Sequence, residues 1–416
     1  MLAATGCVGS SLEQTPLPDT PPQAVPAVPQ TAASADAQSE ASADDDDAPV
    51  SQHAAGASPP AAATTGIASP HYACRRPAPA GRSACAAIVA TAADASRVAH
   101  GCAKSVPYCA SDLAAAYGLT AAAASRGKGE VVAIVDAYGY PGAAGDLAVY
   151  RKKMGLPACT VSSGCLRIVN QQGRASPLPR IDGDPNEDWR IEQAADLDVV
   201  SAICPNCKLR LVQAKSEKDS DLAAAANAAV AQGAVAVANP YFGQERRRDA
   251  GPYRHPGHAL VASAADDGTG ARMPCSFQTV VCVSGTTLLK DSSPRGWSES
   301  AWHPSGGCSA IVPKPSWQRA GGCRTRVAVD VAALADPATG VAVYDAAAGG
   351  WQQIGGTGVS AVLVAAVFAL GPDAARVNAP QWIWRHGGSD AFHRIGADPG
   401  YDGATGWGTP NGTKGL

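Results

Sequence analysis

Two carboxylates stand four residues apart in the stretch "WRIEQAADLDVVSAI". At about 100° per residue, Glu192 and Asp196 lie on one face of a helix, whereas Asp198 points elsewhere. The helix is otherwise apolar, and two carboxyls on a buried face share protons and raise at least one pKa, which suits acid-base chemistry at low pH. The same spacing is also common on a solvated acidic helix face, so the pair alone does not define a site.

A third carboxylate and a glycine turn add to this chemistry. Asp266 follows the apolar run "ALVAS", where a strand meets a turn, although ordinary turn aspartates occupy such positions too. The stretch "GGTGVSAVL" is a tight turn before an apolar helix, and N–H groups at a helix N-terminus can stabilise an oxyanion. The residue presented there, Gly358, has no side chain.

The elements around these residues alternate between strand and helix patterns. The runs "EVVAIVDAY", "KLRLVQA" and "AVAVAN" are typical of buried strands, and "DLAAAANAAVAQG" is typical of a helix that ends at Gly233. This order predicts an α/β fold with a mostly parallel sheet and helices on both faces. In such sheets, reacting residues gather at the carboxyl ends of the strands.

Composition limits the partners of the chain. Of 416 residues, 46% are hydrophobic and 17% charged, and the formal net charge is -3 with no basic run, which argues against nucleic-acid binding. The longest apolar run, 360–370, is about half of the roughly 20 residues of a membrane-spanning helix. We therefore expect no transmembrane segment.

The cysteines favour export. Twelve of the 13 fall into sequence-adjacent couples: Cys74/Cys85, Cys102/Cys109, Cys159/Cys165, Cys204/Cys207, Cys275/Cys282 and Cys308/Cys323. An even set of this kind indicates disulfides and an oxidising compartment, although sequence does not fix their connectivity. A zinc site at "CPNC" is the competing interpretation, but no second ligand pair follows at zinc-site spacing.

Residues 1–70 differ from the rest of the chain. Most are Pro, Ala, Ser and Asp, which cannot bury enough apolar surface to offset ordering, so we expect a disordered tether. The small residues before Cys7 resemble the end of a bacterial lipoprotein signal, which predicts a lipid anchor at Cys7. A chance cysteine in an Ala-rich N-terminus is the alternative.

Taken in this order, the motifs resemble the sedolisin family of serine-carboxyl peptidases. The resemblance covers about residues 117–410. It rests on "WRIEQAADLDVVSAICPNCKLRLVQA", "RGWSESAWHPSGGCS", "VAVDVAALADPATGVAVYD" and "GYDGATGWGTPNG". It implies a subtilisin-like fold and an unfolded protein or peptide as substrate or ligand.

The resemblance also implies roles for single residues. By position, Glu192 would be the general base and Asp196 the residue that orients it. Asp266 would be the protonated acid that donates to the oxyanion, which fits acidic pH. Ordinary subtilases are disfavoured because none of the eight histidines opens an HGT-like helix, although Asp136 in "VAIVDAY" resembles the subtilase aspartate region.

The nucleophile position departs from the family. The family motif is Gly-Thr-Ser followed by x-Ser-x-Pro, and here Gly358 replaces the serine and Val362 the proline. Loss of the nucleophile costs about 10⁶ in turnover in a related hydrolase, or roughly 8 kcal/mol of barrier. Ser360 lies about 200° further around the helix, so we expect it to face away from Glu192.

Two further departures concern substrate and metal. Pro240 in "ANPYFG" cannot donate a hydrogen bond to an extended peptide, which predicts impaired docking. In the family's calcium loop, Arg394 replaces the early aspartate, which leaves Ile395 and Gly400 as carbonyl donors and Asp402 as a carboxylate. The sequence therefore supports calcium only weakly.

The sequence divides into a signal remnant and tether (1–70), a short Cys-containing propeptide remnant or N-terminal extension (71–116), and a sedolisin-like domain (117–416). Our leading hypothesis is an exported, monomeric and catalytically impaired or inactive homologue that binds peptides or proteins at the cell envelope. The alternatives are an active acid endopeptidase with a substitute nucleophile or an error in the sequence at position 358, and a decaying gene product without a selected role.

Overall fold

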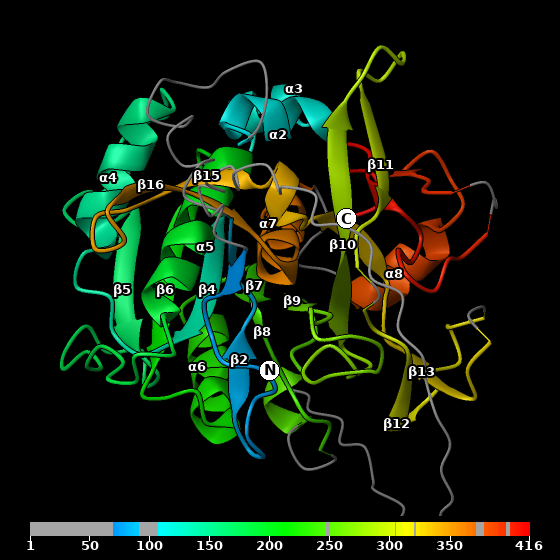
Figure 1. Cartoon of the computed structure of the whole chain (residues 1–416), viewed down its shortest axis with the longest axis horizontal. Helices are drawn as coiled ribbons and strands as arrows, with labels where there is room; N and C mark the ends of the chain where they lie inside the picture. The colour runs from blue at the N-terminus through cyan, green and yellow to red at the C-terminus, as the bar shows by residue number, and fades with distance from the viewer. Residues whose placement is uncertain are drawn as a thin grey trace, which may run out of the picture. The chain divides into compact units, whose positions relative to one another are not determined.

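The computed structural model describes residues 70–90, 107–246, 250–303, 305–319, 322–371, 378–396 and 400–416 (Figure 1). All of them lie in one compact unit, Ala63–Leu416. The predictions for Cys7, for Cys102 and for the tether before residue 70 fall outside the described residues.

A mostly parallel sheet forms the centre of this unit, as predicted. Its order is β11 (Trp297–Ala301), β10 (Val280–Lys290), β9 (Ala259–Ser263), β7 (Ala236–Asn239), β4 (Val131–Ala137), β6 (Lys208–Ala214) and β5 (Leu166–Asn170), with β14 (Val331–Leu334) also paired to β10. The β10–β11 pair is antiparallel and the other pairs are parallel. The unbroken apolar runs of β4, β6 and β7 suit strands that are buried on both faces.

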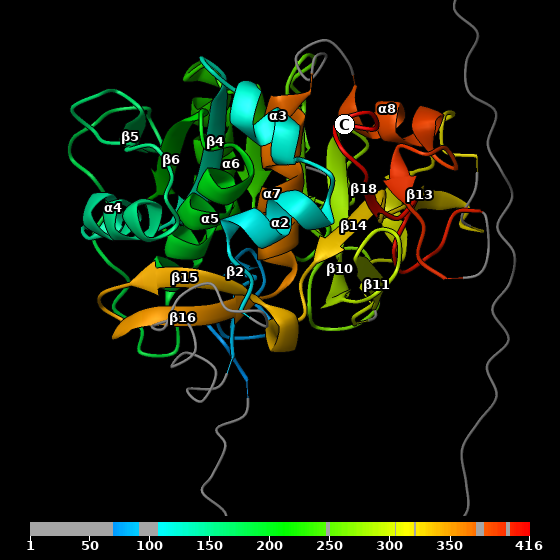
Figure 2. The ribbon, with the colours of Figure 1, turned by 90° about the horizontal axis from the view of Figure 1, so that it is seen from above.

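Two buried helices lie side by side over this sheet and carry the candidate site (Figure 2). Asp188 is the N-cap of helix α5 (Trp189–Ile203), and its carboxylate accepts a hydrogen bond from the N–H of Arg190. Every residue of α7 (Thr357–Leu370) is buried, as expected for a helix that is apolar all round. Helix α4 (Ala143–Lys153) packs against α5, and α6 (Asp219–Ala231) packs on β4 and β6.

The smaller elements complete the unit. They are α2 (Ala110–Ala116), α3 (Thr120–Ser125), α8 (Ala379–His386), β12 (Cys308–Pro313), β13 (Thr325–Val327), β17 (Phe392–His393), β18 (Thr409–Pro410), and the 3₁₀ turns η2 (Gly251–Tyr253) and η3 (Pro337–Thr339).

Residues 70–90 form short strands that pair with strands from later parts of the unit. In the second sheet, β15 (Val341–Asp345) pairs with β16 (Gly350–Gly355), which pairs with β3 (Ile88–Val89), and β3 pairs with β1 (His71–Tyr72). Between these two short strands of the N-terminal segment, β2 (Ser83–Cys85) pairs with β8 (Tyr241–Gly243). This segment, drawn in blue in Figure 1, therefore connects β8 and β16, which lie far from it in sequence.

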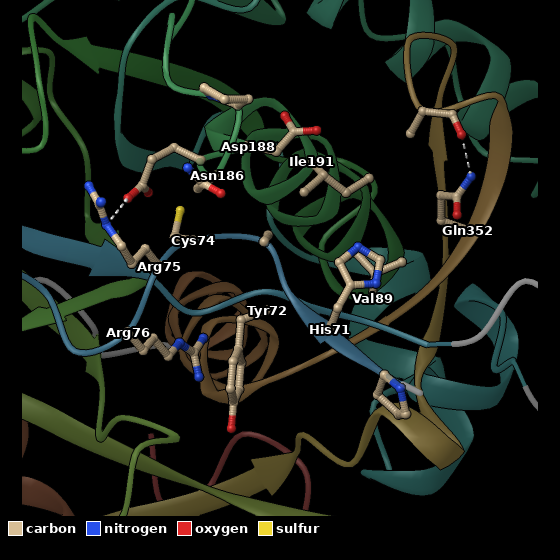
Figure 3. Close-up of a pocket in the computed structure, with 15 residues that line it drawn as sticks. His71, Tyr72, Cys74, Arg75, Arg76, Val89, Asn186, Asp188, Ile191 and Gln352 are labelled. Atoms are coloured by element: carbon tan, nitrogen blue, oxygen red, sulfur yellow. Dashed lines mark hydrogen bonds and ion pairs between the residues drawn. The ribbon is translucent and has the colours of Figure 1, made fainter. Parts of the chain in front are cut away.

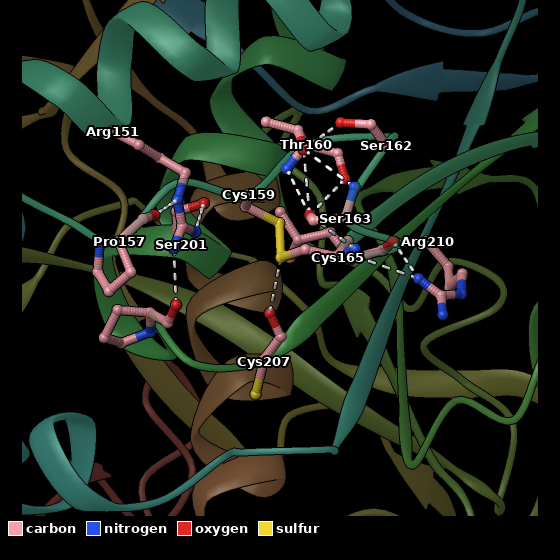
Figure 4. Close-up of a disulfide and its surroundings, with 12 residues drawn as sticks. Arg151, Pro157, Cys159, Thr160, Ser162, Ser163, Cys165, Ser201, Cys207 and Arg210 are labelled. Atoms are coloured by element: carbon pink, nitrogen blue, oxygen red, sulfur yellow. Dashed lines mark hydrogen bonds between the residues drawn. A yellow bond between two sulfur atoms is a disulfide. The ribbon is translucent and has the colours of Figure 1, made fainter.

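Five disulfides join described residues, each within a sequence-adjacent couple: Cys74–Cys85, Cys159–Cys165, Cys204–Cys207, Cys275–Cys282 and Cys308–Cys323. The zinc alternative at "CPNC" is wrong, because Cys204 and Cys207 are bonded to each other. Cys165 Sγ lies 3.7 Å from the carbonyl oxygen of Cys207, so the Cys159–Cys165 and Cys204–Cys207 disulfides are neighbours (Figure 4). The disulfides are compatible with an exported protein.

Within the described ranges, no helix has both the length and the apolar character needed to cross a bilayer.

Candidate active site

The structure brings three carboxyls together between α5 and β4 of the central sheet. Glu192 and Asp196 project from α5 and Asp136 from β4, and all three are buried. Burial raises the pKa of Asp136 to about 7, and burial together with the charge of Asp136 raises the pKa values of Glu192 and Asp196 well above their usual range. Closely spaced carboxylates in an apolar surrounding cannot all ionise, so this cluster holds protons at neutral pH.

Asp266 lies at the other side of the site, three residues beyond the end of β9. Ala265, just before it, has a φ of 93°, a left-handed conformation that is strained for alanine. The Asp266 carboxylate accepts a hydrogen bond from the N–H of Thr357, at 2.9 Å, at the start of α7. Burial raises its pKa, and the nearby Arg76 opposes that rise.

Gly358 is the second residue of α7 and lies against Glu192. A Cβ on Gly358 would overlap Glu192 Oε1 and would lie 3.2 Å from the Cβ of Ala86. The carboxylate thus fills the space in which a side chain at position 358 would begin. Ser360 is turned to β14, where its hydroxyl donates to the carbonyl oxygens of Ala333 and Leu334 at 2.9 and 2.8 Å.

The N-terminal segment lies directly on these groups. The N–H of Ala87 donates to Glu192 Oε2, and the N–H of Ala86 donates to the carbonyl oxygen of Pro240 at 3.1 Å. In this contact Pro240 accepts a hydrogen bond and needs no N–H, and its effect on the docking of a separate peptide stays a prediction. Gly356, with a φ of 98°, leaves room for the carbonyl oxygen of Ala86, which a Cβ there would overlap.

Arg76 connects the same segment to Asp266. Its Nη1 lies 3.1 Å from Asp266 Oδ2, and the two side chains are only 4% and 0% exposed. Its Nη2 donates to the carbonyl oxygen of Cys85 at 3.1 Å. The guanidinium lies over the ring of Tyr72, 4.1 Å from the centroid, as Figure 3 shows, and 5.1 Å from that of Phe242.

A cavity of about 800 Å³ remains beside the segment. Its lining includes Arg76 and Val89 from the segment, Asp188 and Ile191 at the start of α5, and Gln352 on β16 (Figure 3). None of the three clustered carboxyls lines this cavity, whereas the segment contacts Glu192 directly through the N–H of Ala87.

Sequence reasoning missed Arg76 and the position of residues 83–89. The run "CRRPAPAGRSACAAIV" carries two hints, a pair of cysteines that close a short loop and a run of small apolar residues after it. Neither hint says where the loop docks, because its partners lie more than 100 residues further along the chain.

Asp402, the carboxylate that the resemblance assigns to a calcium site, is engaged in hydrogen bonds within its own loop. Asp402 Oδ1 already accepts from the N–H groups of Ala404 and Thr405 and from the Thr405 hydroxyl, at 2.8 to 2.9 Å. The Arg394 guanidinium, a cation, donates to the carbonyl oxygen of Gly388 nearby in sequence. Among the described residues, no three His, Cys, Asp or Glu side chains are grouped so as to hold a metal.

Comparisons with known proteins agree with this arrangement. No family model matches the sequence, and no curated protein matches it. Among solved structures, it is similar to Pseudomonas sedolisin, a serine-carboxyl proteinase complexed with pseudo-iodotyrostatin, with 20% identity, a TM-score of 0.60, and coverage of 74% of this chain and 96% of that one.

Fervidolysin from Fervidobacterium pennivorans, a keratinolytic enzyme related to subtilisin, is a more distant neighbour, with 15% identity, a TM-score of 0.46, and coverage of 71% of this chain and 44% of that one. The similarity to sedolisin extends over nearly the whole of that chain. The described residues therefore have a sedolisin-like, subtilisin-type protease fold.

Proposed function

We propose that this chain is an exported sedolisin-fold protein that holds an extended peptide in its cleft without hydrolysing it. The observation that carries the proposal is Gly358, which lies at the start of α7 against Glu192 and offers no nucleophile. The role of nucleophile at this position is taken from the resemblance to sedolisins. Ser360 does not replace it, because its hydroxyl is committed to two carbonyl oxygens on the far side of the helix.

The state of Asp266 supports the same proposal. An acid at the oxyanion position donates a hydrogen bond only while it holds a proton. Burial raises the pKa of Asp266 and so favours the protonated donor, but its Oδ2 is already paired with the buried guanidinium of Arg76, which opposes that rise. Both the missing nucleophile and the engagement of Asp266 by Arg76 and Thr357 oppose hydrolysis.

The competing function is an acid endopeptidase with a substitute nucleophile. The hydroxyl of Thr357 favours it, because this buried residue begins α7, its N–H donates to Asp266, and its hydroxyl has no hydrogen-bond partner among the described residues. Thr357 lies next to Asp266 and Gly358 lies against Glu192, so a threonine attack would proceed without the neighbouring general base that the resemblance assigns.

An activity assay at about pH 3 to 5, where an acid-base carboxyl pair works, separates the two functions. We expect the wild-type chain to cleave an unfolded protein no faster than a heat-denatured sample of itself. Cleavage that disappears in Glu192→Gln would refute the proposal. Cleavage that survives Glu192→Gln but disappears in Thr357→Val would assign the activity to the threonine.

A further inference from the structure

Residues 83–89 occupy the cleft in the manner of a bound peptide. Strand β2 runs antiparallel to β8, with Ser83 opposite Gly243 and Cys85 opposite Tyr241. Strand β3 then runs antiparallel to β16, with Ile88 opposite Gly355. The segment is thus held by main-chain hydrogen bonds on both sides, which is how a protease cleft or a sheet edge holds an extended peptide of any sequence.

Between these two strands, one peptide bond lies over the candidate site. On its carbonyl side, the oxygen of Ala86 lies against Gly356, and the Cβ of Ala86 is 3.2 Å from the Cβ position of residue 358. On its nitrogen side, the N–H of Ala87 donates to Glu192 Oε2. The Ala86–Ala87 bond therefore lies beside both the place of the missing nucleophile and the carboxyl that would move its proton, which are themselves in contact.

We infer that Ala86–Ala87 is an internal substrate bond, held in the register for cleavage and left intact because residue 358 is glycine. The inference rests on the proposed function and adds the occupant of the cleft and its register. The segment also defines the preferred ligand, an extended peptide with alanine-sized side chains on both sides of the bond, since Ala86 and Ala87 are both completely buried.

The chemistry that a serine at position 358 would add is balanced. Its hydroxyl oxygen attacks the carbonyl carbon of Ala86, and its proton passes to Glu192. Glu192 then protonates the nitrogen of Ala87 as the C–N bond breaks, which leaves residue 86 esterified to the serine. One water hydrolyses that ester, so each cleavage consumes one water and needs no other reactant.

The first experiment introduces the nucleophile as Gly358→Ser in the full chain, incubated at about pH 4. We expect the chain to accumulate as two pieces, 1–86 and 87–416, identified by intact mass. Among the described disulfides none links the two pieces, since Cys74–Cys85 closes within the first, so a non-reducing gel resolves them. The matched controls are Gly358→Ala, which adds the same Cβ without a hydroxyl, and Gly358→Ser with Glu192→Gln. Cleavage at a different bond would overturn the inference.

A second experiment tests the register without catalysis. The pair Ala86→Cys with Gly358→Cys places two Cβ atoms 3.2 Å apart, so a shift of a few tenths of an ångström brings them to the usual disulfide separation of roughly 3.5–4.5 Å. We expect these two cysteines to crosslink on oxidation, and the pair Ala84→Cys with Gly358→Cys to remain uncrosslinked, as judged by peptide mass mapping. Failure of the first pair to crosslink in a folded protein would show that the segment does not lie in this register. By contrast, cleavage of added protein by the wild type would refute the proposed function.

Discussion

At the scale of single residues, the contact between Arg76 and Asp266 places a positive charge beside one acid of the candidate site. Both side chains are almost fully buried, and the guanidinium also donates to the main chain at Cys85. A buried carboxylate that keeps its charge requires such a partner. The pair therefore attaches the N-terminal segment to Asp266 and occupies one oxygen of the group to which the resemblance gives the acid role.

Removal of this partner should be costly and pH-dependent. We expect Arg76→Ala to lower the free energy of unfolding by about 3–5 kcal/mol at neutral pH, because an unpaired carboxylate stays buried. Burial already holds the folded-state pKa of Asp266 above its unfolded value, and without Arg76 it rises further. The folded variant then takes up a proton at a higher pH than the wild type, so the loss should shrink as pH falls through this raised pKa toward about 4.

Arg75 offers a matched control for this measurement by urea denaturation. Its side chain is 53% exposed and pairs with Asp184 at 3.3 Å, so Arg75→Ala should cost less than about 1 kcal/mol at either pH. Equal losses in both variants would contradict the assigned role of Arg76, as would a loss in Arg76→Ala that does not change with pH.

The sequence predicts part of the site well. Helical periodicity places Glu192 and Asp196 on one face, and the turn before α7 places Gly358 at a helix start, because both are local properties of the chain. The partnership of Arg76 is not predictable in this way, since it joins residues that are 190 positions apart. The sequence also does not show that the N-terminal segment uses the carbonyl oxygen of Pro240 and not its nitrogen.

At the scale of elements, the Cys74–Cys85 disulfide closes the loop that carries Arg76 and ends at β2. One end of this loop pairs with β8 and the other leads from β1, so the bond limits how far the segment can leave the cleft. Loops of this length stabilise a fold by roughly 3 kcal/mol through the entropy of the unfolded chain.

Hydrogen exchange should report this restraint locally. In Cys74→Ser with Cys85→Ser, we expect faster exchange of the N–H groups of Ala86 and Ala87, because the opening of the segment becomes easier. The control is Cys308→Ser with Cys323→Ser, which removes a loop of similar length at β12 and should leave these two N–H groups unchanged. Unchanged exchange in the first variant would show that the strand pairing alone holds the segment.

At the scale of the whole molecule, the alternation of strands and helices predicts the central sheet correctly. β4, α5, β6, α6 and β7 follow from continuous apolar runs and helix periodicity, which are strong signals over short distances. The short strands β1, β2 and β3 have two or three residues each, and their pairing depends on partners elsewhere. Their place in the fold is therefore a tertiary property.

The buried carboxyls should also shape the stability of the whole molecule. Burial raises the pKa of Asp136 to about 7 and raises those of Asp196 and Glu192. The folded state thus binds more protons than the unfolded state between about pH 4 and 7, so the free energy of unfolding should fall as pH rises through that range.

Denaturation at several pH values checks this slope. We expect Asp136→Asn to flatten the slope of unfolding free energy against pH by about one proton, because the amide cannot bind the proton that the raised pKa of Asp136 lets the folded state hold. Asp390→Asn is the control, since this exposed carboxylate pairs with Lys414 and its pKa is lowered. Stability that rises from pH 4 to 7 would contradict the protonated cluster.

The close approach of Gly358, Glu192 and Ala86 has a consequence for how this protein can change over generations. In an open cleft, the ligands that bind there constrain which substitutions the lining residues tolerate. Here the constraint comes from packing against a segment of the same chain. Tolerated substitutions should therefore conserve side-chain volume and should occur as compensating pairs across the contact. A saturation library scored only for folding would then detect this region as strongly as it detects the interior of α7.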